Sequence, residues 1–311
     1  MANNSANSAA VSGKKKTFSD ICKENIGFFF ILPWLIGFCI FKLYPMGSSL
    51  FYSFTDNNLF KGTNVIGTLQ NYIEVFTDRK IVTALKVTFK YAFLETPLKL
   101  VFALFIAYIL NFKIKGVNFF RTAYYIPSIL GGSVAIAVLW KAVFRDDGLL
   151  NGFLAIFGIQ GPSWLSDAKC ALFVVIFLRV WQFGSAMVIF LAALKGVPQD
   201  LYEAASIDGA TKWRQFFSVT VPMITPIIFY NFVTQLCQAF QEFNGPYIIT
   251  QGGPRSATTL VSLLIYNKAF KEYDMGMASA MAWVLFIILA AFTAISFLSQ
   301  KYWVFYSDEE G

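Results

Sequence analysis

The sequence predicts an all-α integral membrane protein with six transmembrane helices. Of its 311 residues, 57% are hydrophobic and only 14% are charged, and the mean hydropathy is +0.57. Soluble domains carry about 45–50% apolar and about 25% charged residues. The apolar residues also form runs long enough to cross a ~30 Å hydrocarbon layer, which takes about 20 residues for each helix. A soluble fold would need a core for each of these runs, so the membrane interpretation is favoured.

The six spans are expected in order along the chain. The first runs from about residue 26 to 54, and because Pro33, Gly37 and Pro45 interrupt it, we expect it to bend. Its Lys42 should face protein or an interface. The other five spans are expected at about 82–110, 122–144, 172–194, 223–243 and 276–299. Residues 26–300 then form one membrane domain, between a disordered cytoplasmic tail at 1–25 and a C-terminal tail at 301–311.

Two of the spans carry many polar residues. Lys86, Lys90, Glu95 and Lys99 lie in the first half of the second span, so we expect that half to be amphipathic and to begin outside the hydrocarbon layer. Its membrane portion is expected to start near Pro97. The fifth span has low hydropathy, but flanking apolar runs need it and an even number of crossings returns the chain to its starting side. Its polar residues are Asn231, Gln235, Gln238, Gln241 and Glu242.

The distribution of Lys and Arg orients the chain, because cytoplasmic loops are enriched in positive charge. These residues are slightly more numerous on the side of the N-terminus, mainly through Lys14, Lys15 and Lys16 and the short 111–121 loop. The net charge of +7 is therefore interpreted as juxtamembrane charge, and no basic stripe suggests binding to nucleic acid. We expect a multi-pass protein with a cytoplasmic N-terminus.

Enzymatic and metal chemistry find no support in the sequence. The chain has no His, and Cys22, Cys39, Cys170 and Cys237 show no CxxC spacing, which argues against a metal cluster or a disulfide framework. No GxxxxGK[ST] sequence occurs, so the chain cannot bind ATP through a P-loop. No GxSxG or HExxH motif occurs either. The sequence therefore predicts no catalytic residue, no metal ligand and no cofactor in this chain.

The segment between the fourth and fifth spans, residues 195–222, is polar on one side and apolar on the other. Pro198 suits the first turn of a helix, and Asp200 places negative charge near that N-terminus. Gly209 permits a positive φ that ends the helix. A second amphipathic stretch then begins at Trp213 and ends at Pro222. The segment is predicted to form a helix–turn–helix across the cytoplasmic face.

Four residues of this segment carry a resemblance to a known family. Glu203, Ala204, Ala205 and Gly209 resemble the EAA loop of the membrane subunits of binding-protein-dependent ABC importers. Other blocks resemble the carbohydrate-uptake branch of that family: residues 120–127 (FRTAYYIP), residues 148–151 (GLLN) and residues 250–254 (TQGGP). The resemblance extends over nearly the whole predicted membrane domain. It implies the fold of a type I importer permease of the maltose and glycerol-phosphate kind.

The resemblance also implies a role for this loop and a set of partners. In such families the EAA helix is the coupling helix, which docks in a cleft of the ATPase subunit. Glu203 would then be the charged contact, Ala204 and Ala205 would permit close approach, and Gly209 would form the turn. The implied partners are a second homologous permease, two ATPase subunits that bind ATP and Mg, an extracellular solute-binding protein and a sugar substrate, at a bacterial or archaeal cytoplasmic membrane. The loop could instead lie on lipid headgroups, but acidic residues on its polar face offset the basic ones.

The polar residues of the fifth span form the candidate substrate site. Asn231, Gln235, Gln238 and Glu242 recur at intervals of four, three and four, which places them on one face of a helix. Amides and carboxylates hydrogen-bond sugar hydroxyls, and in the family substrate contacts come from this helix. The same residues could equally hold the bundle together through interhelical hydrogen bonds.

Polar groups in other spans leave further alternatives open. Gln182 in the fourth span is a weaker candidate for substrate binding, and the nearby Arg179 could be only an interhelical salt-bridge partner. Glu95 and Glu242 are the clear carboxylates within the spans, so an ion-coupled secondary transporter of a small polar solute is the alternative function. Such a transporter would be expected to show internal repeats and paired carriers at mid-membrane, and neither is evident in the sequence.

Overall fold

The computed structural model describes residues 26–56, 67–112 and 115–305, and within these ranges the regular elements are helices. The predicted all-α class is therefore confirmed. The chain divides into two compact units, residues 1–51 and residues 52–311. The predicted N-terminal tail, residues 1–25, lies outside the described residues, as do residues 306–311 of the predicted C-terminal tail.

The first unit contains the first predicted span. It consists of α2 (Ile26–Phe38), the π-helical η1 (Cys39–Leu43) and the greater part of α3 (Tyr44–Ser53). Residues Phe30–Ser53 are long and apolar enough to cross a membrane. Pro45 has no N–H group for the carbonyl four residues earlier, and the π-helical turn lies directly before it. The expected bend is not among the breaks of more than 40°, and residues Phe30–Ser53 form one helix. The interruption takes the form of the π-helical turn, within which Lys42 is exposed.

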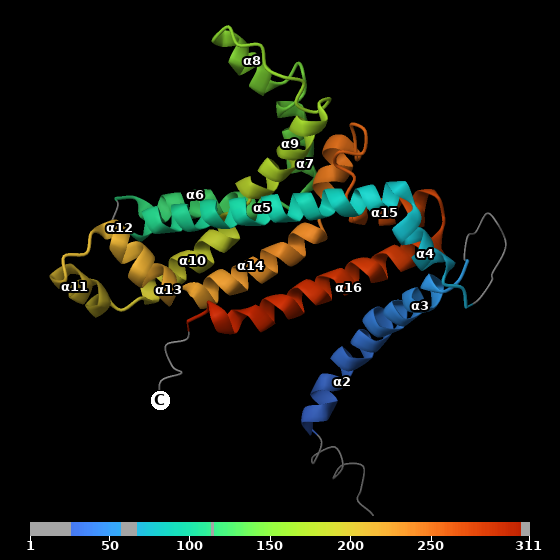
Figure 1. The fold of residues 1–311 in the computed structure, drawn as a ribbon, viewed down its shortest axis with the longest axis horizontal. Coiled ribbons are helices and arrows are strands. Elements are labelled where there is room, and N and C mark those ends of the chain that lie inside the picture. The colour runs from blue at the N-terminus through green and yellow to red at the C-terminus, as the bar shows by residue number, and fades with distance from the viewer. Residues whose placement is uncertain (1–25, 57–66, 113–114, 306–311) are drawn as a thin grey trace, which may run out of the picture. The chain divides into compact units, whose positions relative to one another are not determined.

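The second unit contains the remaining helices, which are coloured from cyan to red in Figure 1. In chain order they are α4 (Gln70–Thr77), α5 (Arg79–Asn111), α6 (Val117–Leu130), α7 (Val134–Val143), α8 (Leu149–Ile156), α9 (Ala168–Trp181), α10 (Gly184–Gly196), α11 (Gln199–Ile207), α12 (Lys212–Gln215), η2 (Phe216–Thr220), α13 (Val221–Met223), α14 (Thr225–Phe240), η3 (Pro246–Thr250), α15 (Val261–Tyr266), η4 (Asn267–Lys271), α16 (Met275–Ser299) and η5 (Gln300–Tyr302).

Three of the predicted spans are continuous helices and three are broken. The continuous ones include α5, with 33 residues, and α16, which lie on either side of α14 (Figure 1). The span expected at 122–144 is α6 followed by α7 with a bend of 102°, and the span at 172–194 is α9 followed by α10 with a bend of 45°. The fifth span is α14, which meets the preceding 212–223 segment at 68° and already ends at Phe240. Six crossings are plausible if each bent pair is one span.

The charged first half of α5 is amphipathic, as expected. Asp78 caps the helix by accepting hydrogen bonds from the backbone N–H groups of Lys80 and Ile81. Lys86 and Lys90 are exposed, whereas Glu95 and Lys99 are buried inside the second unit. The helix therefore has a charged surface only in its first three turns, and its later charges face protein.

Three hydrophobic clusters form the interior of the second unit. The first cluster joins the first half of α5 to α9, α14, α15 and α16 around Tyr91 and Phe240. The second cluster joins the second half of α5 to α10 and the start of α14 around Met187 and Phe190. The third cluster joins α7, α9 and η3 around Val174. These clusters hold the helices that carry the candidate functional residues.

Candidate functional site

The predicted helix–turn–helix is present as a hairpin formed by α11, a turn at Gly209 and the helical segment 212–223. Gly209 has a φ of 73°, a conformation that costs a residue with a Cβ atom about 1–2 kcal/mol. The turn therefore forms for the reason that the sequence suggested. The second arm leads into α14, which it meets at an angle of 68°.

Side-chain contacts fix the two arms of the hairpin to each other. Gln215 is buried, and its Nε2 donates hydrogen bonds to Ser206 Oγ at 2.8 Å and to the Ala210 carbonyl at 3.1 Å. The hydroxyls of Tyr202 and Thr220 are 2.9 Å apart. This buried amide, with two hydrogen-bond acceptors, fixes the position of the second arm against the first. The pattern of the sequence does not indicate this contact.

The outer face of α11 makes no such contacts with the rest of the described chain. None of its residues is buried: Glu203 and Ala204 are exposed, and Ala205 is half-buried. Ile207 is 88% exposed and Trp213 is 73% exposed, so apolar surface lies next to the acidic residue. Exposed apolar patches of this kind mark surfaces that bind protein or membrane. The hairpin thus carries Glu203 on an exposed, partly apolar surface.

The polar residues of α14 have different surroundings, although the sequence places them on one face. Asn231 and Gln235 are 1% and 5% exposed, whereas Gln238 is exposed. Asn231 Nδ2 donates to the Ile227 carbonyl at 3.2 Å. Asn231 Oδ1 and Gln235 Oε1 are buried without a hydrogen-bond partner among the described residues. Buried oxygens of this kind are normally satisfied by water or a ligand.

The prediction that Glu242 shares a helix face with Asn231, Gln235 and Gln238 is wrong, because α14 ends at Phe240 and Glu242 lies in the turn that follows. There Glu242 is buried and forms an ion pair. Its Oε2 lies 3.2 Å from Nε of Arg179 on α9, and its Oε1 accepts a hydrogen bond from the backbone N–H of Gly245 at 2.9 Å. Ser262 donates a hydrogen bond to the Glu242 carbonyl. Arg179 is therefore a salt-bridge partner, as the sequence suggested, but its partner lies in the turn after α14 and not within a helix.

Gln182 occupies a position between two broken helices. Its Nε2 donates to the Gly131 carbonyl at 3.2 Å, and its Oε1 accepts from Arg179 Nη1 at 2.8 Å. Both ends of the amide are used, and the side chain is 4% exposed. The structure thus gives Gln182 a role in joining helices, and its amide groups already have protein partners.

A second buried charge pair lies on α5. Glu95 Oε1 and Lys99 Nζ are 3.7 Å apart, one helical turn from each other, and both also interact electrostatically with Arg179 and Glu242. Two positive and two negative groups therefore balance in the interior, which is the usual condition for charges buried in a membrane domain. The sequence marked Glu95 and Lys99 as charges at the start of a span and did not predict that they would be buried together.

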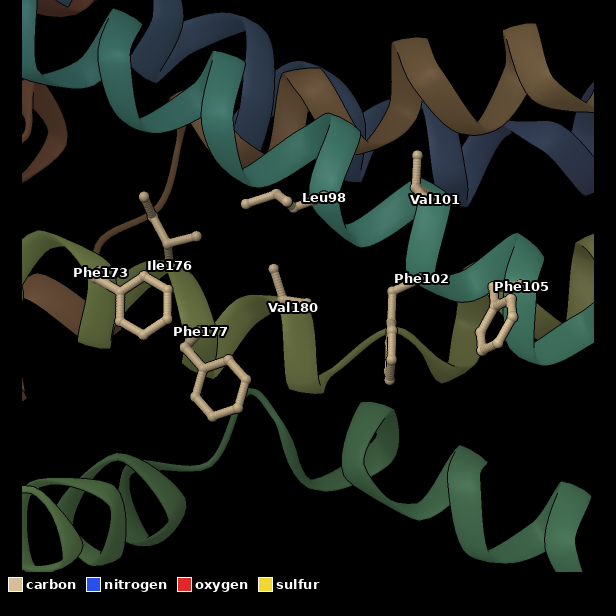
Figure 2. A pocket seen from close by; sticks show the side chains of 8 residues that line it. All are labelled: Leu98, Val101, Phe102, Phe105, Phe173, Ile176, Phe177 and Val180. Carbon is tan, nitrogen blue, oxygen red and sulfur yellow. The ribbon is translucent and has the colours of Figure 1, made fainter. Parts of the chain in front are cut away.

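The apolar pocket of the second unit is a poor candidate for a sugar site. It has a volume of about 460 Å³ and lies between α5 and α9 (Figure 2). Leu98, Val101, Phe102 and Phe105 line it from α5, and Phe173, Ile176, Phe177 and Val180 line it from α9. Sugar sites need hydrogen-bonding groups, and none of these eight side chains has one. In the described part of the chain, no group of three or more Cys, Asp or Glu residues could hold a metal ion either.

Comparisons with known proteins give a consistent result. A family described as "Binding-protein-dependent transport system inner membrane component" matches residues 99–304. The chain is 48% identical over 300 residues to "Probable ABC transporter permease protein YesP" of Bacillus subtilis (strain 168), which covers 95% of this chain and 97% of that protein. It is 33% identical over 290 residues to "Multiple sugar-binding transport system permease protein MsmF" of Streptococcus mutans, with 92% and 99% covered.

A solved structure has a similar fold. It is a chain of a bacterial alginate ABC transporter in complex with an alginate pentasaccharide-bound periplasmic protein. The TM-score is 0.78 at 20% identity, and the match covers 91% of this chain and 96% of that chain. The likeness supports the arrangement of helices described above.

Proposed function

Because the chain belongs to the family of binding-protein-dependent transport system inner membrane components, we propose that it is the permease subunit of an ATP-driven ABC importer. It translocates a sugar or oligosaccharide that an extracellular solute-binding protein delivers. The observation that carries this proposal is the exposed hairpin with Glu203 on α11, on a chain similar over nearly its full length to ABC transporter permeases. The name of one relative, "Multiple sugar-binding transport system permease protein MsmF", supports a sugar as the substrate class.

The proposed assembly contains this chain, a second homologous permease and two ATPase subunits. ATP and Mg are bound by the ATPase subunits, so this chain is a transport subunit and not an enzyme. It lies in the cytoplasmic membrane of a bacterium or archaeon, with its N-terminus and the hairpin on the cytoplasmic side. The broken and continuous helices with lengths suited to spanning a bilayer support the membrane location, and the distribution of Lys and Arg supports the orientation.

The proposed coupling follows from the rigidity of the hairpin. Glu203 contacts the ATPase, Ala204 and Ala205 permit close approach, and Gly209 allows the turn. When the ATPases close on ATP, they move the hairpin, and because its second arm continues into α14, the movement reaches the helix with the candidate substrate residues. ATP can reorient the pathway only by binding one state more tightly than the other.

The proposed substrate contacts lie on α14 and its end. Gln238 is the most accessible of the predicted residues. Asn231 and Gln235 each have a buried oxygen that a sugar hydroxyl or a water could satisfy. Glu242 and Gln182 already have protein partners, so their proposed contribution to binding is to position the neighbouring backbone. The ion-coupled alternative is not favoured, because Glu95 and Glu242 both face a cation within the chain.

Purification of the complex tests this proposal. The chain is expressed together with its neighbouring genes, extracted in detergent, and the subunits that accompany it are identified and counted by mass spectrometry. A second permease and two ATPase copies are expected. A lone chain or a homodimer that still transports the solute would contradict the proposal and favour a secondary transporter.

A further inference from the structure

Buried polar residues separate two of the hydrophobic clusters along α5. The first cluster includes Ala92 and the second cluster begins at Leu100. Between them lie Glu95, Thr96 and Lys99, which are at most 2% exposed. Side chains within a hydrophobic cluster pack tightly against one another. The two halves of α5 therefore belong to two different clusters, which we call packed bodies, and the polar residues lie at the boundary between them.

The neighbouring helices have the same interruption. On the α9–α10 pair, the third cluster includes Leu178 and the second cluster begins at Phe183. On α14, Ile228 packs against the second cluster and Leu236 belongs to the first. Between these positions lie the buried polar residues Gln182, Asn231 and Gln235 and the half-buried Arg179, next to apolar residues such as Phe232, which packs against both clusters. We call the whole set the polar layer: Glu95, Thr96, Lys99, Arg179, Gln182, Asn231 and Gln235.

Irregular backbone meets the polar layer at three places. The bend between α6 and α7 lies at residues 131–133, the bend between α9 and α10 lies at residues 182–183, and α14 ends in the turn at residues 241–245. Each leaves backbone groups without helical partners inside a membrane domain, where an unpaired group is costly. The two bends are joined through Ser128: its Oγ donates to the Gln182 carbonyl at 3.0 Å and accepts from the N–H of Ser185 at 2.9 Å.

Arg179 connects all three places. Its Nε forms the ion pair with Glu242, which holds the 241–245 turn through the Gly245 N–H. Its Nη1 donates a hydrogen bond to Gln182, which bonds the Gly131 carbonyl at the α6–α7 bend. Gly131 fits this contact because a Cβ atom there would overlap the Gln182 side chain. A planar guanidinium can serve two acceptors in fixed directions, which a lysine ammonium on a flexible stem cannot do as well.

We propose that Arg179 is a positioning residue for transport, which fastens the two helix bends and the 241–245 turn so that they move as one hinge between the packed bodies. The proposal rests on the proposed transport function. The second cluster lies on the side of the hairpin, so its tilt under the ATPases is passed to the other clusters through this hinge. When the Arg179 contacts are lost, the second cluster can still tilt, but α7 and the third cluster no longer move with it.

Distances across the two bends test the proposal in the assembled transporter. The four native cysteines are replaced, and spin labels are placed at the exposed Phe119 and Val138, across the α6–α7 bend, or at Phe173 and Val188, across the α9–α10 bend. Distances are measured with and without ATP, and sugar uptake per ATP hydrolysed is measured in vesicles. In the wild type, ATP should change both distances together.

The variants are Gln182→Met, which cuts the link to Gly131, and Arg179→Lys, which keeps the charge. In each, the response of the α6–α7 distance to ATP should weaken, because Gln182 loses either its bond to Gly131 or the Arg179 group that holds its amide, while the Ser128 bonds remain. Uptake per ATP should fall about five-fold or more, the range of a typical coupling energy. Arg145→Met is the matched control, because Arg145 forms an ion pair with Asp147 that is 60% and 74% exposed. It should leave all readouts unchanged.

Three results would overturn the proposal. The first is that ATP changes neither distance in a wild type that imports sugar. The second is that uptake per ATP is unchanged in both variants, and the third is that uptake falls only in proportion to the amount of assembled complex. The first leaves the proposed function intact, because uptake is still observed. If Gln182→Met does not assemble, Arg179→Lys decides the question, since it leaves the Gln182 amide and its bond to Gly131 in place. Absence of ATP-driven uptake in the wild type would instead contradict the proposed function itself.

Discussion

Glu242 and Gln238 belong to one polar pattern in the sequence but have opposite surroundings. Glu242 is buried and paired with Arg179, whereas Gln238 is exposed near the end of α14. Removal of one partner from a buried ion pair leaves an uncompensated charge and costs about 3–5 kcal/mol. Removal of an exposed amide usually changes stability by less than about 0.5 kcal/mol. The two residues therefore allow substrate binding and stability to be separated.

Alanine substitutions at these two residues should have different effects. Gln238→Ala should weaken sugar uptake while the melting temperature of the complex stays within error of the wild type. Glu242→Ala should lower both the melting temperature and the yield of complex, because Arg179 loses its partner. Thermal unfolding in detergent and uptake in vesicles measure the two effects. Unchanged uptake kinetics in Gln238→Ala would show that Gln238 does not contact the substrate.

Glu203 should act on coupling without an effect on folding. It is exposed on α11, a helix with no buried residue, so Glu203→Ala should change the stability of the isolated chain by less than about 0.5 kcal/mol. It should lower sugar uptake by loosening the ATPase or uncoupling its activity. Asp147→Ala, at another exposed carboxylate, is the control. Normal sugar uptake in Glu203→Ala would be evidence against the coupling role of α11.

At the scale of elements, the features that could be predicted from the sequence are those that depend on residues close together in the chain. Five of the six spans follow from runs of apolar residues and the turn at Gly209 follows from one residue type, whereas the polar fifth span was inferred from its flanking runs and an even number of crossings. Three continuous helices, three bent pairs and the turn are present. The bends at 131–133 and 182–183 were not predicted, because they depend on contacts between distant segments. Gln182 bonds the carbonyl of Gly131, 51 residues earlier in the chain. Burial also depends on contacts between distant segments. The sequence therefore could not distinguish Asn231, which is buried, from Gln238, which is exposed, although both are amides of the same polar pattern.

The turn of the hairpin should be sensitive to a single methyl group. Gly209→Ala places a Cβ atom at a φ of 73° and should destabilise the turn by about 1–2 kcal/mol. Faster hydrogen exchange is expected in α11 and in the 212–223 segment, together with weaker coupling. Gly196→Ala is the control, because Gly196 ends α10 and has open space where a Cβ atom would stand. Equal exchange in both variants would contradict the structural role of Gly209.

At the scale of the whole molecule, the chain combines tightly packed hydrophobic clusters with exposed apolar surfaces. The clusters of the second unit and its balanced buried charges form an interior that needs no other subunit to satisfy its ion pairs. The hairpin and many apolar side chains of the helices remain exposed. Lipid covers such side chains within a bilayer, whereas the hairpin requires a protein partner in our account. In the proposed assembly, this chain therefore forms the transport path together with the second permease.

Solute uptake by the reconstituted complex tests this account most directly. The chain, its second permease and the ATPases are placed in vesicles with the binding protein outside and labelled sugars, and uptake is measured with and without internal ATP. For an ABC importer, uptake should require both ATP and the binding protein and should persist when ion gradients are dissipated. Uptake driven by an ion gradient without ATP would contradict the proposed function.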